Sequence, residues 1–133
     1  MNEINIQELA IGWVKHVNEF SKDENASKYA WAWDAEFDLK YDNPELLWEL
    51  IQEINKIDQS TNIAEVLAAG PLEDLLAMHG EKFIEVIEAK AKKDQSFAFL
   101  LGGVWQNDMD AKIWQRVQAV WDRRGWDGIP KES

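Results

Sequence analysis

Cysteine is absent from this 133-residue chain, and histidine occurs only twice. Without cysteine the chain has no disulfide, no zinc–thiolate site and no thiol nucleophile. The absence also fits a reducing compartment, so we expect a cytoplasmic protein. Because two histidines without cysteine rarely complete a zinc site, we expect neither a metal nor another cofactor.

Long apolar runs are missing as well. No stretch approaches the roughly 18 apolar residues that a membrane-spanning helix needs, and residues 1–8 lack the basic and apolar segments of a signal peptide. We therefore expect no membrane association. Basic residues are scarce: 14 lysines and arginines stand against 25 acidic residues, for a net charge of −11. Such a surface repels nucleic acid, so no nucleic-acid partner is expected.

The negative charge is unevenly spread along the chain. Residues 1–56 carry twelve acidic residues against five lysines, whereas residues 95–133 carry five residues of each sign, including all three arginines. One interpretation is an acidic face that only keeps the protein soluble. The other is an acidic face that binds a basic protein partner.

Apolar residues recur at three- and four-residue steps, and no segment alternates with period two, so the sequence predicts helices and no strands. A first helix over about 4–20 is predicted from Ile6, Leu9, Trp13, Val17 and Phe20. A second, capped by Ser27 after a polar loop at 21–25, is predicted from the stripe Ala30, Trp33, Phe37 and Tyr41. Asn43 and Pro44 suit the start of a third helix. Most of the eight tryptophans are expected in the core, because each buries a large area.

Glycines punctuate the rest of the chain. Gly70 is expected to end a short helix in a left-handed conformation, Pro71 to begin the next helix, and Gly80 to end that one. Gly102 and Gly103 interrupt a later helix. Asp108 is expected to cap the last helix, and Trp126–Ser133 to form a coil tail.

Two segments resemble each other at an offset of 36 residues. Residues 44–60 and 80–96 are identical at seven of seventeen positions, including a shared Asp-Gln-Ser at 58–60 and 94–96. Repeats of this period are typical of stacked helical hairpins. The sequence therefore predicts an all-α domain over residues 1–125, a short array of antiparallel helix pairs resembling an α-α superhelix of the HEAT or armadillo type.

One of the two histidines, His79, follows Glu73 and Asp74 in the segment Gly70–Gly80. At about 100° per residue, neither acid shares a helix face with His79, so a dyad within one helix is not expected. The acids suit a helix start, and the histidine suits a helix end. A site would need a basic or aromatic group from another helix.

Complete catalytic patterns are missing. The helical acid pairs Glu49/Glu53 and Glu85/Glu88 are more typical of exposed helix faces than of a two-carboxylate enzyme. No catalytic residue and no metal ligand is predicted. One or two tryptophans are expected to be partly exposed, and exposed tryptophan is typical of binding hot spots. Trp126, beside Arg123 and Arg124, is the candidate for an exposed contact, and Trp105 is a further binding candidate.

The chain resembles an uncharacterised bacterial domain family with the signature Ala-Ala-Gly-Pro-Leu-Glu-Asp-Leu-Leu-x-x-His-Gly. The resemblance covers about residues 29–121 and is carried by Ala68–Leu76, His79-Gly80, Phe83-Ile84, Phe97, Val104-Trp105, Trp31-x-Trp33 and Asn43-Pro44-Glu45-x-x-Trp48. It implies a bacterial source and a shared fold. It brings no activity, because the family has none assigned.

Three functions follow as hypotheses. The first is a non-enzymatic bacterial cytoplasmic interaction or regulatory protein, which uses an acidic helical surface and is immunity-like if the partner is a toxin. The second is an enzyme or small-molecule binder with a site near the Gly70–Gly80 turn, formed by Glu73, Asp74 and His79. The third is a structural oligomer, which an exposed apolar patch including Trp105 or Trp126 would favour.

Overall fold

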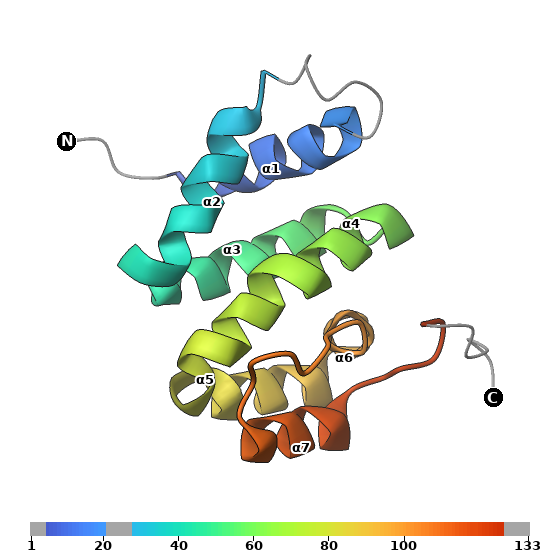
Figure 1. Cartoon of the computed structure of the whole chain (residues 1–133). Coiled ribbons are helices and arrows are strands. Elements are labelled where there is room, and N and C mark those ends of the chain that lie inside the picture. Colours follow the sequence, from blue (N-terminus) through green and yellow to red (C-terminus); the bar gives the residue numbers. More distant parts are fainter. Residues whose placement is uncertain (1–4, 21–27, 127–133) are drawn as a thin grey trace. The chain divides into compact units, whose positions relative to one another are not determined.

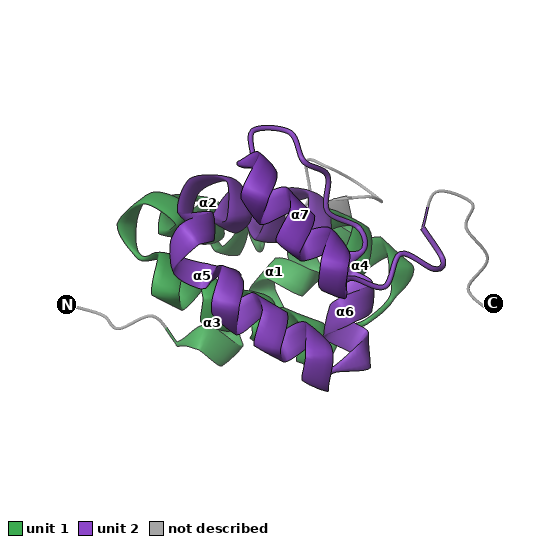
Figure 2. Cartoon of the chain, turned by 90° about the horizontal axis from the view of Figure 1, so that it is seen from below, with its two compact units in different colours: residues 1–66 green, residues 67–133 purple. Residues whose placement is uncertain are grey.

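The computed structural model describes residues 5–20 and 28–126. Every regular element within these ranges is a helix, which confirms the all-α prediction. The chain groups into two compact units, residues 1–66 and 67–133, coloured green and purple in Figure 2. The repeat array and the single domain over residues 1–125 stay predictions.

Three helices build most of unit 1: α1 (Ile6–Phe20), α2 (Ala30–Asp42) and α3 (Pro44–Ile57). Each packs against the other two, as Figure 1 shows for α1 and α2. The start of α3 is as predicted, because Oδ1 of Asn43 accepts a hydrogen bond from the amide of Leu46 at 3.1 Å. The core of this unit includes Leu9, Trp13, Ala32, Leu39, Leu47, Leu50, Ile51 and Ile54.

Some predictions for unit 1 concern residues that the structure does not describe, and one is wrong. The side chain of Phe20, the loop at 21–25 and the cap Ser27 lie outside the described residues. The expectation that most tryptophans are core is wrong. Among the eight, Trp13 is fully buried, whereas three are exposed and four are half-buried. The indole is wide and carries a polar N–H, so it often lies at the rim of a core rather than inside it.

Unit 2 begins at Leu67, the last residue of α4 (Thr61–Leu67). It contains the π-helical turn η1 (Ala68–Leu72), then α5 (Glu73–Lys93), α6 (Gln95–Leu101) and α7 (Ala111–Val120). Helix α5 is the centre of this unit, since η1, α6 and α7 all pack against it.

The prediction that Gly70 ends a helix in a left-handed conformation is wrong. Among the described glycines only Gly125 has a positive φ, and Gly70 lies inside η1. Pro71 has no amide hydrogen to donate, and its ring would crowd an α-helical carbonyl. The chain widens into a π turn instead, in which the amide of Glu73 bonds to the carbonyl of Ala68.

Gly80 does not end its helix either, because α5 continues to Lys93. The break falls one residue earlier, at His79, whose φ of −133° and ψ of 25° are not helical. Figure 1 shows α5 changing direction along its length. Gly80 has a different purpose: a Cβ there would lie 3.0 Å from Cγ2 of Ile113, so the missing side chain lets α7 approach α5 closely.

At the C-terminal end, the break at Gly102 is as predicted, since α6 ends at Leu101. The prediction of Asp108 as a cap is wrong. The cap of α7 is Asp110, whose Oδ1 accepts a hydrogen bond from the amide of Lys112 at 2.8 Å. Met109, which stands between the two aspartates in the sequence, is buried, and the helix starts two residues later than a cap at Asp108 would place it.

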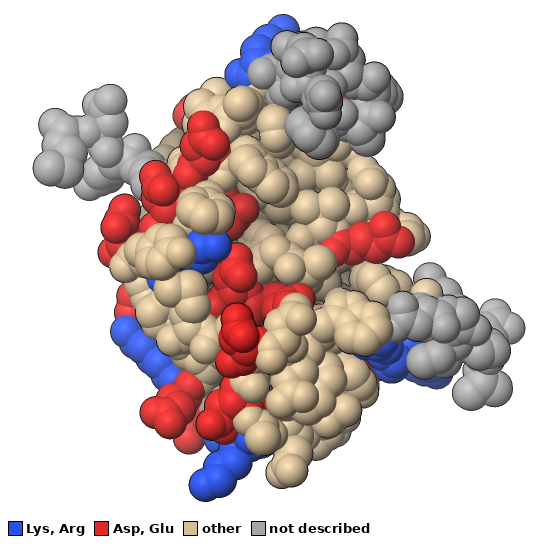
Figure 3. Space-filling view, in the orientation of Figure 1, with Lys and Arg blue, Asp and Glu red and all other residues tan. Residues whose placement is uncertain are grey.

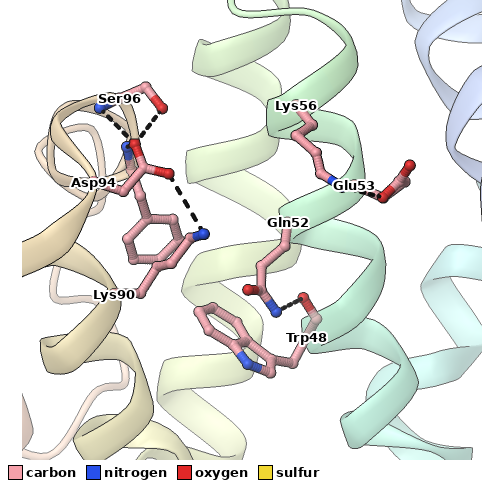
Figure 4. Close-up of polar contacts among 8 residues, drawn as sticks. Trp48, Gln52, Glu53, Lys56, Lys90, Asp94 and Ser96 are labelled. Atoms are coloured by element: carbon pink, nitrogen blue, oxygen red, sulfur yellow. Dashed lines mark hydrogen bonds and ion pairs between the residues drawn. The ribbon is translucent and has the colours of Figure 1, made fainter.

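The shared Asp-Gln-Ser of the two similar segments has a local structural role. Oδ1 of Asp58 accepts a hydrogen bond from the amide of Ser60 at 2.8 Å. Oδ1 of Asp94 accepts from the amide and from the hydroxyl of Ser96, at 3.0 and 2.7 Å, as Figure 4 shows. In both segments the aspartate thus organises the turn between a long helix and a short one.

Candidate functional site

Helix α2 reverses the ordinary amphipathic pattern, because charged side chains lie on its buried side and large aromatic side chains on its exposed side. Its buried side holds Ala32 and Leu39, but also two charged residues, Glu36 and Lys40, which are only 5% and 7% exposed. The carboxylate of Glu36 accepts a hydrogen bond from Nε1 of Trp13 at 3.1 Å. A partner inside the fold satisfies this buried charge, as burial requires.

The outer side of α2 carries the aromatic side chains. The predicted stripe does lie along one side of α2, but this side is exposed to solvent. Trp33, Phe37 and Tyr41 are 37%, 50% and 63% exposed. Trp31 on the same helix is 52% exposed. We call these four residues the α2 aromatic face. Four large exposed rings on one short helix exceed the scattered apolar residues of an ordinary surface.

Part of this face is held in place by neighbouring groups. The ring of Trp33 stacks on Trp13 of α1 with 5.8 Å between centroids, and its other near neighbour is His16 at 5.3 Å. Nζ of Lys40 lies 3.7 Å from the centroid of Phe37. These contacts fix the rings and leave a substantial part of each open.

Three acidic residues accompany the aromatic rings. Asp34, Asp38 and Asp42 are all exposed and recur at four-residue steps, about 6 Å apart along the helix. At about 100° per residue they lie on the same half of α2 as the α2 aromatic face, and Trp31 is closest to Asp34, which follows it by three residues. None of the three forms an ion pair with a described residue. Figure 3 shows acidic side chains along the surface that α2 contributes.

A second candidate lies in unit 2, at the bend of α5. A pocket of about 390 Å³ opens there beside His79 and Gly80. Its polar lining comes from His79, Glu81, Lys82 and Asp110, and Ile113 of α7 contributes apolar surface. The pocket therefore joins the bend of one helix to the start of another, and it holds groups of both charge signs.

The other two predicted members of this site lie elsewhere. Glu73 is buried, at 6% exposure, and accepts a hydrogen bond from Nδ2 of Asn107, so its charge is used inside the fold. Asp74 is half-buried in the first turn of α5. Neither lines the pocket at His79. The structure thus keeps one of the three residues at a cavity and assigns the other two to the start of the helix.

Trp105, a predicted binding candidate, is 55% exposed and belongs to a cation–aromatic cluster. The guanidinium carbon of Arg123 lies 5.1 Å from the ring centroid of Trp105 and 5.0 Å from that of Trp121. Nη1 of the same arginine donates to the carbonyl of Gly102 at 2.8 Å. The arginine therefore links the segment that follows α7 to the end of α6.

Trp126, the candidate for an exposed contact, is half-buried. Its ring stacks on Phe99 at 5.0 Å, and its Nε1 donates to the carbonyl of Phe99 at 2.8 Å. A Cβ on Gly103 would lie 2.6 Å from this indole, so the glycine makes room for it. Trp126 thus packs as part of unit 2 and is not the first residue of a tail. The remainder of the predicted tail lies outside the described residues.

One member of each helical acid pair forms an ion pair. Arg116 forks onto Glu88 with distances of 2.8 and 2.6 Å, and this hydrogen bond holds the pKa of the Glu88 carboxyl below its ordinary value. Glu53 pairs with Lys56 at 3.4 Å, as Figure 4 shows. Within residues 5–20 and 28–126, no cluster of three or more His, Asp or Glu side chains could hold a metal ion.

A comparison with known protein families shows which family the chain belongs to. A family described as "Family of unknown function (DUF6869)" matches residues 19–125, which is most of the chain. The chain belongs to this family. A search of curated proteins and of solved structures finds no significant match.

The region matched to the family contains all of α2 and every residue that lines the pocket at His79. Both candidate sites therefore lie within the family domain.

None of the helices in the described ranges combines the length and apolar character that crossing a bilayer requires.

Sequence reasoning missed the α2 aromatic face as a surface. Ala32 and Leu39 mark one side of the helix, while Trp33 and Phe37 mark another, so apolar residues surround α2. The sequence does contain one signal for the orientation of α2, the series Asp34, Asp38 and Asp42. Charged residues at four-residue steps mark the side of a helix that faces water. The aromatic rings share that side.

Proposed function

We propose that this protein is a non-enzymatic interaction or regulatory protein of the bacterial cytoplasm, which binds a basic protein partner through α2. The observation that carries the proposal is the inversion of α2, with Glu36 and Lys40 buried and the α2 aromatic face exposed. Burying the remaining exposed part of each ring in an interface would contribute about 1 kcal/mol per ring. Aromatic residues of this kind are enriched at binding hot spots.

The charge of the same helix favours a basic partner. Asp34, Asp38 and Asp42 flank the rings, and the whole chain carries a net charge of −11. Complementary charge accelerates encounter and selects partners more than it adds affinity. An immunity-like role, in which the basic partner is a toxin, is one form of this proposal.

A titration followed by ¹⁵N NMR tests the proposal. The probe is a synthetic helical peptide whose arginines recur every four residues, about 6 Å apart, which matches the spacing of the aspartates on α2. We expect amide shifts concentrated in α2 and the facing residues of α1. Shifts spread evenly over both units, or no shifts at millimolar peptide, would contradict α2 as the binding surface.

A second candidate function is supported by the pocket at the bend of α5. Its volume of about 390 Å³ lies within the range of small-molecule sites, and His79 and Lys82 could orient an anionic group there. A fragment screen read by NMR tests it. Fragments that shift His79, Lys82 and Asp110 together, and that lose binding in an Ile113→Trp variant, would support it. A screen without such fragments would leave α2 as the candidate site.

A further inference from the structure

The chemistry of the α2 surface narrows the partner beyond its charge. Exposed rings and exposed carboxylates share one half of the helix, and two of the rings have an aspartate as a near neighbour. Trp31 precedes Asp34 by three residues, and Tyr41 follows Asp38 by three residues, which is close to one helical turn. A guanidinium can use both kinds of group at once, because it is planar, stacks on aromatic rings and forms paired hydrogen bonds to a carboxylate. An ammonium group is a strongly hydrated point charge and uses such a surface less well.

Arginine makes both kinds of contact inside this fold. The guanidinium carbon of Arg123 lies about 5 Å from the ring centroids of Trp105 and Trp121, and Nη1 still donates to a backbone carbonyl. Arg116 uses its fork on one carboxylate. Each half of the expected recognition, ring stacking and the two-point carboxylate bond, therefore occurs among the described residues.

A second copy of this chain is a poor source of the arginines. All three are already engaged within unit 2, since Arg116 binds Glu88, Arg124 binds Asp122 at 2.8 and 2.9 Å, and Arg123 is stacked. Exposing one of them would break those contacts. The net charge of −11 also opposes association of two copies through α2.

We propose that the outer half of α2 recognises arginine side chains of a different protein, spaced about 6 Å apart, which stack on Trp31 and Tyr41 and pair with Asp34, Asp38 and Asp42. This inference rests on the proposed function and specifies its partner. It requires both the rings and the acids, whereas a general acidic surface requires only the acids.

Two peptides of the same length and charge separate these cases, one with arginine and one with lysine at the same positions. Their affinities for the protein are measured by calorimetry at moderate salt. We expect the arginine peptide to bind roughly fivefold tighter, because each exposed cation–aromatic contact adds a few-fold in affinity. In the double variant Trp31→Leu/Tyr41→Leu, we expect the preference for arginine to disappear while charge-driven binding remains.

The outcomes distinguish the inference from the proposed function. Equal binding of both peptides to the unaltered protein would overturn the arginine inference and leave a basic partner at α2 standing. No binding of either peptide would overturn both. A preference that persists in the double variant would place the stacking elsewhere and overturn the assignment to α2. Circular dichroism of the variant, with the half-buried Trp126→Leu as a matched tryptophan loss in unit 2, controls for unfolding.

Discussion

Nε1 of Trp13 donates a hydrogen bond to the carboxylate of Glu36 at 3.1 Å, and both side chains are buried. This contact ties α2 to α1 by a polar group on the inner side of α2. It accounts for the orientation of the helix, because turning α2 to bury its rings would leave Trp13 without this acceptor and would bring the exposed aspartates toward the core.

The first prediction concerns this contact. Glu36→Ala removes the acceptor and leaves a buried indole N–H unsatisfied, so we expect the free energy of unfolding to fall by about 1–3 kcal/mol. Glu36→Gln keeps a carbonyl oxygen at the same place and should cost less. Urea denaturation measures both. Equal losses in the two variants would show that the hydrogen bond to Trp13 does not orient α2.

The second prediction separates two neighbouring aspartates. Asp110→Ala removes the cap of α7 and should lower the free energy of unfolding by about 1 kcal/mol. Asp108→Ala is the matched control, because Asp108 is exposed and does not cap the helix, and it should change stability little. The reverse order in thermal melts would restore Asp108 as the cap.

The third prediction compares two glycines with opposite surroundings. A Cβ on Gly102 would overlap the backbone carbonyl of Asp122, so Gly102→Ala should destabilise by about 1–3 kcal/mol. A Cβ on Gly70 meets nothing within 4 Å, and this residue has no positive φ. Gly70→Ala should therefore be neutral or stabilise by about 0.5–1 kcal/mol. A strongly destabilised Gly70→Ala protein would contradict the π turn at Ala68–Leu72.

The glycines also show how far the sequence predicts this fold. Asn43 with Pro44 fixes the start of α3 as expected, because capping is local chemistry. Gly102 ends α6 as expected too, but the need for glycine there comes from the backbone of Asp122, which is distant in sequence. Gly70 with Pro71 has the composition of a helix end, yet packing of the flanking Ala68 and Leu72 in the core keeps the chain helical through a wider turn.

The candidate sites were less predictable, because they depend on contacts between distant residues. The pocket at His79 needs Asp110 and Ile113, some thirty residues later in the chain, and no local pattern places them there. The orientation of α2 depends on Trp13 in another helix. Sequence periodicity alone could choose neither side of α2, since both carry apolar residues.

The fourth prediction concerns pH. The Ser96 hydroxyl, followed by the Phe97 amide and Lys90, holds the pKa of the Asp94 carboxyl below its ordinary value. A lowered pKa in the folded state means that the carboxylate stabilises the fold fully above its unfolded pKa, and that this contribution is lost as pH falls through the lower, folded value. We expect the urea concentration at the unfolding midpoint to decrease as the pH is lowered below about 5. The decrease should be smaller in Asp94→Asn, which has no carboxyl to protonate at this position. Parallel curves for the two proteins would contradict this role.

The binding surface itself is tested most directly by the fifth measurement, the affinity of the arginine peptide for two triple variants of equal charge. Asp34→Asn/Asp38→Asn/Asp42→Asn removes the acids of α2, and Glu49→Gln/Glu65→Gln/Glu85→Gln removes three exposed acids of other helices. Each exposed charge pair contributes about 0.2–1 kcal/mol, so we predict a roughly tenfold loss of affinity in the α2 variant and a much smaller loss in the other. Equal losses in the two variants would show that net charge alone attracts the peptide, and would contradict α2 as the binding surface.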